Sequence, residues 1–288
     1  MNTSTKTMTH TNQNKKLILI TGATSGIGQA AAQALTAQGH GLILVGRNPA
    51  KTAQVAEAIR KQTGSDKVHF LLADFSDLQQ VRDLADQVKK QFPPLNVLVN
   101  NAGTVFLRRY RTNYGVEKTF LVNHLAHFLL TNLLLDHLNE HARIVNVSSG
   151  SHFNGELDLN DLEMNKNYFV MKAYARSKLA NVLFTYELVR RLGDKKITVN
   201  ALHPGRVGTD IFKANLPILG LLLKWMVSRI SLTPEEGADN TIFLSASAEV
   251  EGVTGKYFVK RDAVPSSKLS YDETLAKQLW EVSEKLTA

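Results

Sequence analysis

The sequence predicts an α/β protein, a single doubly wound domain of the Rossmann type with a parallel sheet of about seven strands and helices on both faces. Short apolar runs such as LILI at 17–20 and LILV at 42–45 alternate with longer segments of helical period. These runs are continuous rather than alternating, which indicates strands buried on both faces. A glycine-rich turn follows the first run, and no repeat or low-complexity linker divides the 288 residues.

The remaining elements follow the same alternation. After the first helix, at 26–38, Asn48-Pro49 is a typical start for a second helix, and Ser76 or Asp77 is suited to cap a third. A long helix is expected at about 115–139, and another that ends at about 192. Strands are expected at 17–20, 42–45, 68–72, 95–99, 143–147 and 197–202. We expect residues 1–16, which are mostly polar, to be a disordered lead-in to a domain at 17–288, with 205–232 as a substrate-covering segment.

Composition excludes several classes of protein. The chain has no cysteine, so disulfides, thiolate catalysis and cysteine-based metal sites are excluded. Its net charge of +8 is scattered rather than gathered in a stripe, and we expect no nucleic-acid partner. The apolar segment at 216–227 is interrupted by Pro217 and Lys224 and is shorter than the roughly 20 residues that span a bilayer. We therefore expect a cytoplasmic protein without membrane contact, although an amphipathic contact at 211–230 is an alternative.

The turn after the first strand predicts a phosphate-binding loop. Gly22, Gly26 and Gly28 lie in TGATSGIG at 21–28, with the spacing G-x-x-x-G-x-G. Glycine lets the backbone approach a pyrophosphate closely, and the free N–H groups and dipole of the next helix favour an anion. An ordinary strand-to-helix turn is the alternative, but the position after the first strand favours a nucleotide site.

The end of the second strand predicts which dinucleotide binds. A carboxylate at this place would hold the ribose 2′-hydroxyl of NAD(H). The chain has Arg47 there instead, and its first acidic residue is Glu57. Because a guanidinium suits a 2′-phosphate, we expect NADP(H) as cofactor and NAD(H) as the less favoured one.

Tyr174 and Lys178 form the most informative pair in the chain. Their spacing of four residues stacks them on one face of a helix. An ammonium near a phenol favours the phenolate, so we expect the pKa of Tyr174 to fall from about 10 toward neutral pH. A phenol tuned in this way can exchange a proton with an alcohol or an alkoxide.

Together these elements resemble the short-chain dehydrogenase/reductase family over about residues 17–260. The motifs are TGATSGIG at 21–28, NNAG at 100–103, VNVSS at 145–149, YARSK at 174–178 and HPG at 203–205. The stretches VNHLAHFLL at 122–130 and SKLANVLFTYELVRRL at 177–192 further resemble the retinol-dehydrogenase-like branch, which acts on retinoids and other lipophilic alcohols and aldehydes.

The resemblance implies roles for four catalytic residues. Tyr174 would be the general acid/base, and Lys178 would lower its pKa and bind the nicotinamide ribose. Ser149, rather than its neighbour Ser148, would polarise the substrate carbonyl. Asn123 would hold a water that links Lys178 to solvent.

The resemblance also implies that Asp74 accepts from the adenine amino group, that Asn101 braces the sheet beside the cofactor, and that Thr209 binds the carboxamide. Taken singly, each has a structural alternative, such as a turn at Asp74 or a helix cap at Thr209. The predicted cofactor-binding set is Gly22, Thr24, Ser25, Gly26, Ile27, Gly28, Arg47, Asn48, Asp74, Phe75, Asn101, Ala102, Gly103, Tyr174, Lys178, Pro204, Gly205, Val207 and Thr209.

One departure from the family concerns Ser149 and Tyr174, which are 25 residues apart, about twice the usual separation. The extra piece, at about 151–170, must fold back so that the two side chains can meet. We expect it to shape a wall of the substrate site, with a surface insertion as the alternative.

The substrate-covering segment suggests the kind of ligand. Residues 211–230 are rich in Leu, Ile and Met, which favours a lipophilic carbonyl or alcohol substrate, unless these side chains pack on the body or form a dimer face. A dinucleotide-binding sensor without turnover is a further alternative. We expect no metal site, although His124 and His127 are three residues apart on a helix. A homodimer or homotetramer is expected to use the outer face of helices 115–139 and 174–192.

Overall fold

The computed structural model describes residues 15–205 and 232–288, in which eight strands form one sheet in the order β3-β2-β1-β4-β5-β6-β7-β8. All pairings are parallel except the last, between β7 and β8. The fold class predicted from the sequence is therefore confirmed, with an additional antiparallel strand at the sheet edge. The strands are β1 (Leu17–Thr21), β2 (Gly41–Gly46), β3 (Val68–Leu72), β4 (Leu95–Asn100), β5 (Leu138–Val147), β6 (Thr198–His203), β7 (Tyr257–Val259) and β8 (Asp262–Val264).

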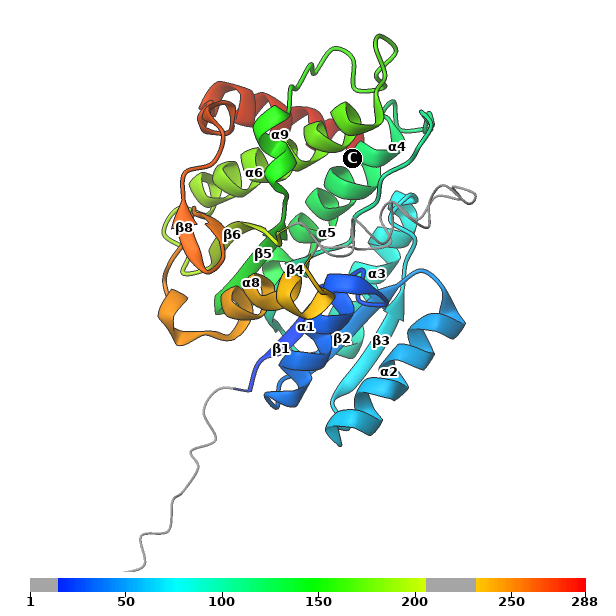
Figure 1. The fold of residues 1–288 in the computed structure, drawn as a ribbon, viewed down its shortest axis with the longest axis vertical. Helices are drawn as coiled ribbons and strands as arrows, with labels where there is room; N and C mark the ends of the chain where they lie inside the picture. The colour runs from blue at the N-terminus through cyan, green and yellow to red at the C-terminus, as the bar shows by residue number, and fades with distance from the viewer. Residues whose placement is uncertain (1–14, 206–231) are drawn as a thin grey trace, which may run out of the picture.

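Helices cover both faces of the sheet (Figure 1). Successive side chains of β1 pack against opposite helical layers. Leu19 packs against the layer of α3, α5, α6 and α9, and Ile18 and Ile20 pack against the layer of α1, α2 and α8. All three are fully buried, as expected for continuous apolar runs in a parallel sheet. The α-helices are α1 (Gly26–Ala37), α2 (Pro49–Thr63), α3 (Leu78–Gln91), α4 (Lys118–Phe120), α5 (Ala126–Leu134), α6 (Val170–Leu192), α8 (Pro234–Ala246) and α9 (Glu273–Thr287).

Local sequence determines where most helices begin. Asn48 caps α2 by accepting from Lys51 N, with Pro49 at the first helical position. Asp77, and not Ser76, caps α3. Helix α1 differs, because its N-cap Ser25 makes no side-chain capping bond and the first N–H groups of that helix are left for another acceptor.

The helix expected at 115–139 is interrupted and ends early. It consists of α4, a π-helical turn at Leu121–Leu125, α5 and a 3₁₀ turn at Leu135–His137. Strand β5 then begins at Leu138, five residues before the predicted start, because Leu138 pairs with Leu95 of β4. Tertiary pairing overrides helical propensity here, and Asn139 Nδ2 also donates to Pro94 O at 2.9 Å.

Helix α9 lies on the face that was expected to be outermost. Trp280 of α9 packs edge-on against Phe128 of α5, at 4.9 Å between ring centroids, and stacks on Phe184 of α6. Part of the outer face of α5 and α6, on which assembly was expected, is therefore covered by an apolar face of α9.

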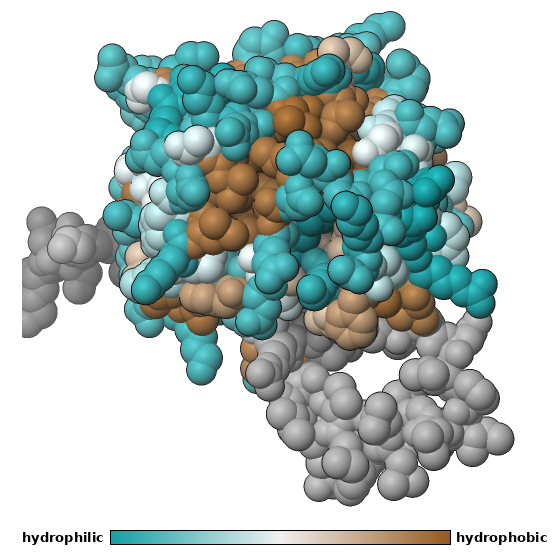
Figure 2. Space-filling view, turned by 90° about the horizontal axis from the view of Figure 1, so that it is seen from above, coloured by the Kyte–Doolittle hydropathy of each residue, from teal (hydrophilic) through white to brown (hydrophobic). Residues whose placement is uncertain are grey.

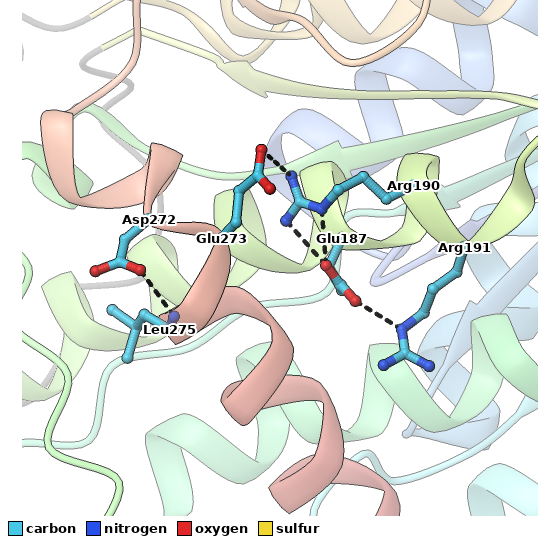
Figure 3. Close-up of polar contacts among 6 residues, drawn as sticks. All are labelled: Glu187, Arg190, Arg191, Asp272, Glu273 and Leu275. Atoms are coloured by element: carbon cyan, nitrogen blue, oxygen red, sulfur yellow. Dashed lines mark hydrogen bonds and ion pairs between the residues drawn. The ribbon is translucent and has the colours of Figure 1, made fainter.

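Ion pairs hold the start of α9 to the end of α6 (Figure 3). Glu187, which is buried, binds both Arg190 and Arg191, and Arg190 reaches Glu273 of α9 at 3.9 Å.

Figure 2 views the face at the top of Figure 1, where α9 lies, and shows an apolar area surrounded by polar side chains. Assembly as a homodimer or homotetramer stays a prediction, and any pairing on this side has to involve α9.

Candidate functional site

A cavity of about 400 Å³ lies at the carboxyl ends of the central strands, on both sides of the switch point between β1 and β4. This is where open α/β sheets bind their ligands. Most residues of the predicted cofactor set line it together, namely Gly22, Thr24, Ser25, Gly26, Ile27, Gly28, Arg47, Asp74, Phe75, Asn101, Ala102, Gly103, Tyr174, Lys178 and Pro204. Asn48 and Gly205 do not line it, and Val207, Thr209 and the segment 211–230 lie outside the described residues.

The glycine loop has room for nothing larger than hydrogen at two positions. Gly22 has φ +66°, and a Cβ there would lie 2.8 Å from Ala102 Cα. A Cβ on Gly28 would lie 2.4 Å from Asn101 Nδ2 and 2.5 Å from Gly22 O. The glycines therefore let the loop, the Asn101 segment and the uncapped start of α1 come together at the floor of the cavity.

Thr21 joins the loop to the end of β4, a role that the sequence analysis did not assign. Its hydroxyl accepts from the backbone N–H groups of both Asn101 and Ala102 at 2.9 Å. The Asn101 amide in turn donates to Thr21 O at 2.8 Å. Asn101 thus joins the ends of β1 and β4 beside the cavity, and its place next to a bound cofactor stays a prediction.

One end of the cavity is cationic. Arg47 at the end of β2 and Lys51 in the first turn of α2 both line it. Lys51 was missed from the sequence, although it lies four residues after Arg47, where a helix that starts at Pro49 turns it toward the same end. The side chain of Asn48 instead caps α2, where its Oδ1 accepts from Lys51 N at 2.9 Å.

Asp74 lies at the cavity, where it was predicted to bind the cofactor, and it also forms a turn, which was the structural alternative. Its carboxylate lines the cavity and also accepts from Ser76 N at 2.8 Å, which closes a turn after β3. Other lining residues were not predicted as part of the cofactor site, although several of them are neighbours of predicted residues at strand ends. These other lining residues are Val45, Gly46, Lys51, Ala73, Ser76, Thr104, Phe106, Lys118, Val122, Val147 and Ser148.

The four residues predicted to be catalytic lie near the other end, where Tyr174 and Lys178 line the cavity and Ser149 and Asn123 do not. Tyr174 and Lys178 lie one turn apart on α6, with Lys178 Nζ 5.6 Å from the centre of the Tyr174 ring. Ser149 hydrogen-bonds the Tyr174 hydroxyl. Asn123 is fully buried, and a Cβ on Gly103 would meet both its Oδ1, at 3.7 Å, and Lys178 Nζ, at 3.4 Å.

Hydrogen bonds fix both Asn123 and Lys178. Asn123 Nδ2 donates to Thr104 O and to Ser177 Oγ, each at 3.0 Å, and its Oδ1 accepts from Thr104 N at 2.8 Å. Lys178 Nζ donates to Val147 O at 3.0 Å. Both side chains are therefore held in fixed positions, and of the two only Lys178 lines the cavity.

The two neighbouring serines differ in their partners. Ser148 is buried, and its hydroxyl donates to the Lys178 carbonyl at 2.8 Å. Ser149 is partly exposed, bonds Tyr174 and also accepts from Ser151 N at 3.2 Å. Only Ser149 therefore has its hydroxyl beside the phenol.

The expected fall in the pKa of Tyr174 is not what the structure supports. Burial raises the pKa of this phenol, and the hydrogen bond from Ser149 opposes that rise only in part. Burial also lowers the pKa of Lys178 to about 8, because an ammonium is poorly solvated there. The sequence predicts the proximity of the two groups correctly, but burial has the largest effect on the pKa of the phenol, so Tyr174 stays protonated at neutral pH.

The extra piece at 151–170 folds back over α6. Arg176, inside the YARSK motif, donates to Asp161 O and Leu162 O at 3.0 and 2.9 Å. Tyr168 OH donates to Phe106 O at 3.0 Å, and Phe106 lines the cavity. The piece is thus fixed against the catalytic helix and supports a wall of the cavity, while its own residues do not line it.

Neither His124 nor His127 faces the cavity. His124 contacts Asn181 and Ser283, and His127 contacts Thr21 and the Asn123 carbonyl.

Among residues 15–205 and 232–288, no helix combines the length and apolar character that crossing a membrane requires.

Comparison with known proteins bears on the family. A sequence model described as short chain dehydrogenase matches residues 16–217. Human polyprenol dehydrogenase is 39% identical over 283 residues, covering 94% of this chain and 85% of the relative. Mouse retinol dehydrogenase 14 is 40% identical over 283 residues, covering 93% of this chain and 85% of the relative.

Solved structures share the fold. An uncharacterised protein from Mycobacterium paratuberculosis has a TM-score of 0.76 at 31% identity, covering 95% of this chain and 93% of its own. A short chain dehydrogenase from Burkholderia cenocepacia in complex with NADP has a TM-score of 0.66 at 28% identity, covering 85% of this chain and 97% of its own.

Proposed function

This chain belongs to the short-chain dehydrogenase/reductase family, as an oxidoreductase of the retinol-dehydrogenase-like branch, and we propose that it transfers a hydride between NADP(H) and a lipophilic carbonyl or alcohol. The observation that carries the proposal is that Tyr174, which Ser149 contacts, and Lys178 line one end of the cavity whose other end is cationic.

The residues around the cavity fit a dinucleotide. Gly22 and Gly28 leave space where a Cβ would collide with the neighbouring backbone or with the Asn101 amide, and α1 begins there without a side-chain cap. Such a helix start suits a pyrophosphate. Arg47 and Lys51 would hold the 2′-phosphate, and Asp74 would accept from the adenine amino group. When bound, the nicotinamide supplies the hydride chemistry.

The protein's part in the reaction is to bind the reacting oxygen and to move its proton. Ser149 would donate a hydrogen bond to the substrate oxygen and stabilise negative charge that develops there. Tyr174, whose raised pKa keeps it protonated, would give its phenolic proton to that oxygen as the carbonyl is reduced. In the direction of alcohol oxidation, the same phenol would have to lose its proton first.

Lys178 and Asn123 would complete the path of the proton. The Lys178 ammonium, with a pKa of about 8, can exchange a proton near neutral pH. Asn123 lies beside it at Gly103 and would hold a water between Lys178 and solvent. Lys178 would also bind the nicotinamide ribose, as it does in the family that the motif resembles.

Replacing Tyr174 by Phe tests the proposed chemistry. We expect the loss of one hydroxyl to lower kcat by about a hundredfold to ten-thousandfold, the usual range for a general acid, with little change in NADPH affinity. Tyr110→Phe is the matched control, because Tyr110 is 47% exposed and does not line the cavity. Unchanged turnover in Tyr174→Phe would remove the mechanism and favour a dinucleotide-binding sensor.

The cofactor preference rests on charge at the end of β2. Arg47→Asp should weaken NADPH and strengthen NADH, because a carboxylate repels the 2′-phosphate and accepts from a 2′-hydroxyl. We expect the ratio of the two dissociation constants to change by at least about a hundredfold, or roughly 3 kcal/mol. Arg108→Asp, at a position that does not line the cavity, controls for the change in net charge. Tighter binding of NADH than of NADPH by the unaltered protein would contradict the proposal.

The substrate class is supported by the relatives and by composition. The two mammalian relatives are named for retinol and polyprenol, both lipophilic alcohols. Residues 211–230 of this chain are rich in apolar side chains. A panel of aldehydes and ketones of increasing chain length, assayed with NADPH by absorbance, should show kcat/KM rising with apolar size. Turnover restricted to small polar ketoses would rule out this substrate class.

The cytoplasmic location of the protein stays a prediction.

A further inference from the structure

We infer that His152 is a positioning residue that holds Ser149 in place against Tyr174. The inference rests on the proposed function, because it gives His152 a role only through the hydroxyl of Ser149. His152 is fully buried and does not line the cavity, so it acts from behind the site.

Both donors of His152 converge on one acceptor. Its backbone N–H lies 3.1 Å from the Ser149 carbonyl oxygen, and its Nδ1 lies 2.7 Å from the same atom. The Ser149 backbone is extended, with φ −163° and ψ 154°, and Ser149 caps the 3₁₀ turn at Gly150–Asn154. A carbonyl held twice in this way cannot shift without losing both bonds, and because its carbon is bonded to the Ser149 Cα, it restricts the position of that Cα and of the side chain it carries.

The second ring nitrogen determines the tautomer. His152 Nε2 lies 3.0 Å from the backbone nitrogen of Ser267, which can only donate. Nε2 must therefore be the acceptor, and the ring proton must be on Nδ1, facing the Ser149 carbonyl. Burial lowers the pKa of His152, in agreement with a neutral ring. Both ring nitrogens are occupied by backbone groups, which excludes a role as general acid or base in this arrangement.

Through Ser267, the contact continues to the helix that carries Tyr174. The neighbouring Ser266 hydroxyl lies 2.7 Å from Tyr186 OH, on α6. Ser266 N also donates to Tyr271 OH at 3.0 Å, and Tyr271 stacks on the Tyr186 ring. Ser149 and Tyr174 are thus joined twice, directly by their hydroxyls and again through His152, the 266–271 segment and Tyr186.

Ring packing keeps the imidazole from turning. Its centroid lies 4.6 Å from that of Tyr257 and 4.2 Å from that of Phe153. Tyr257 is 1% exposed and belongs to β7. The ring is held by tilted contacts with two aromatic side chains and by a hydrogen bond at each of its nitrogens, so its position and that of the Ser149 carbonyl are coupled.

The test uses three variants of His152 in the full chain. His152→Asn places a carboxamide near Nδ1 and can still donate to Ser149, whereas His152→Gln reaches toward Nε2 and loses that donor. His152→Phe removes both bonds and keeps the ring. We expect kcat to fall about tenfold to a hundredfold in the Phe and Gln variants and clearly less in Asn, with NADPH affinity within about twofold of the parent in all three.

A double-mutant cycle with Ser149→Ala separates positioning from general support of the fold. If His152 acts through the Ser149 hydroxyl, His152→Phe should lower kcat less than about twofold once that hydroxyl is gone. If His152→Phe lowers kcat by the same factor with and without the Ser149 hydroxyl, the inference is overturned. It is also overturned if kcat of His152→Asn is no higher than kcat of His152→Gln. If His152→Phe fails to fold, the same cycle with Ser149→Ala is measured with His152→Asn and His152→Gln instead.

The outcomes also distinguish this inference from the proposed function. Ser149→Ala with parental kcat would refute the role of Ser149, and with it the proposed mechanism. Ser149→Ala with strongly reduced kcat, together with His152 variants of parental kcat, would refute the positioning role alone.

Discussion

Two buried histidines, His124 and His127, should make the fold sensitive to mild acid. Burial lowers the pKa of each ring to about 3, well below the ordinary value of 6.5. The folded protein therefore keeps both rings neutral, while the unfolded chain binds a proton on each below pH 6.5. Because the folded pKa is depressed, the stabilisation is present above pH 6.5 and is lost as the pH falls toward 3.

The size of the effect follows from linkage. Each ring costs up to roughly 1.4 kcal/mol of unfolding free energy per pH unit, so the two together should cost about 3 kcal/mol between pH 6.5 and pH 5. The interval stays above the range in which most carboxylates titrate. His152, whose pKa is also lowered by burial, acts in the same direction.

Urea unfolding at pH 6.5 and pH 5, followed by circular dichroism, measures this difference. In His124→Gln one of the two protons is no longer taken up, and the loss of stability between the two pH values should be smaller by about 1.5 kcal/mol. His141→Gln is the control, because His141 is exposed and should leave the difference unchanged. An equal difference in the parent and in His124→Gln would show that burial of the ring does not keep it neutral.

Two further predictions concern the cavity floor and the catalytic helix. Gly28→Ala would place a methyl group 2.4 Å from Asn101 Nδ2 and should weaken NADPH binding about tenfold or more in a fluorescence titration; unchanged affinity would contradict the close approach. Arg176→Met should destabilise the fold by about 3 kcal/mol in urea unfolding, because it removes the hydrogen bonds to Asp161 O and Leu162 O and a positive charge that partly offsets the desolvation of the buried Glu117 carboxylate. Adding Glu117→Gln should recover part of that loss, and no recovery would argue against electrostatic coupling.

Much of the cavity could be predicted because the motifs follow strand ends. Gly22, Arg47, Asp74 and Asn101 each come directly after or near the end of a predicted parallel strand, and parallel strands bring these ends to one edge of the sheet. Order along the chain is then sufficient to bring them together. Lys51 and Lys118 were missed because they reach the cavity from helices, whose facing direction depends on how each helix packs.

The ionisation of Tyr174 could not be predicted from spacing. The four-residue interval correctly places Lys178 one turn away, at 5.6 Å from the ring centre. Whether the phenol loses or keeps its proton depends on how much water and charge surround it, and burial raises its pKa here. Desolvation depends on every element packed around the site, including those distant in sequence.

The sequence by itself determined the α/β fold class and the dinucleotide loop, because apolar period and glycine spacing are local properties of the chain. It also determined the family, through motifs whose order and spacing are read directly. Only the tertiary structure decided that α9 covers α5 and α6, that β5 starts at Leu138, and that His152 links Ser149 to Ser267. Each of these depends on contacts between segments that are distant along the chain, and their energies are fixed by packing and burial rather than by local preference.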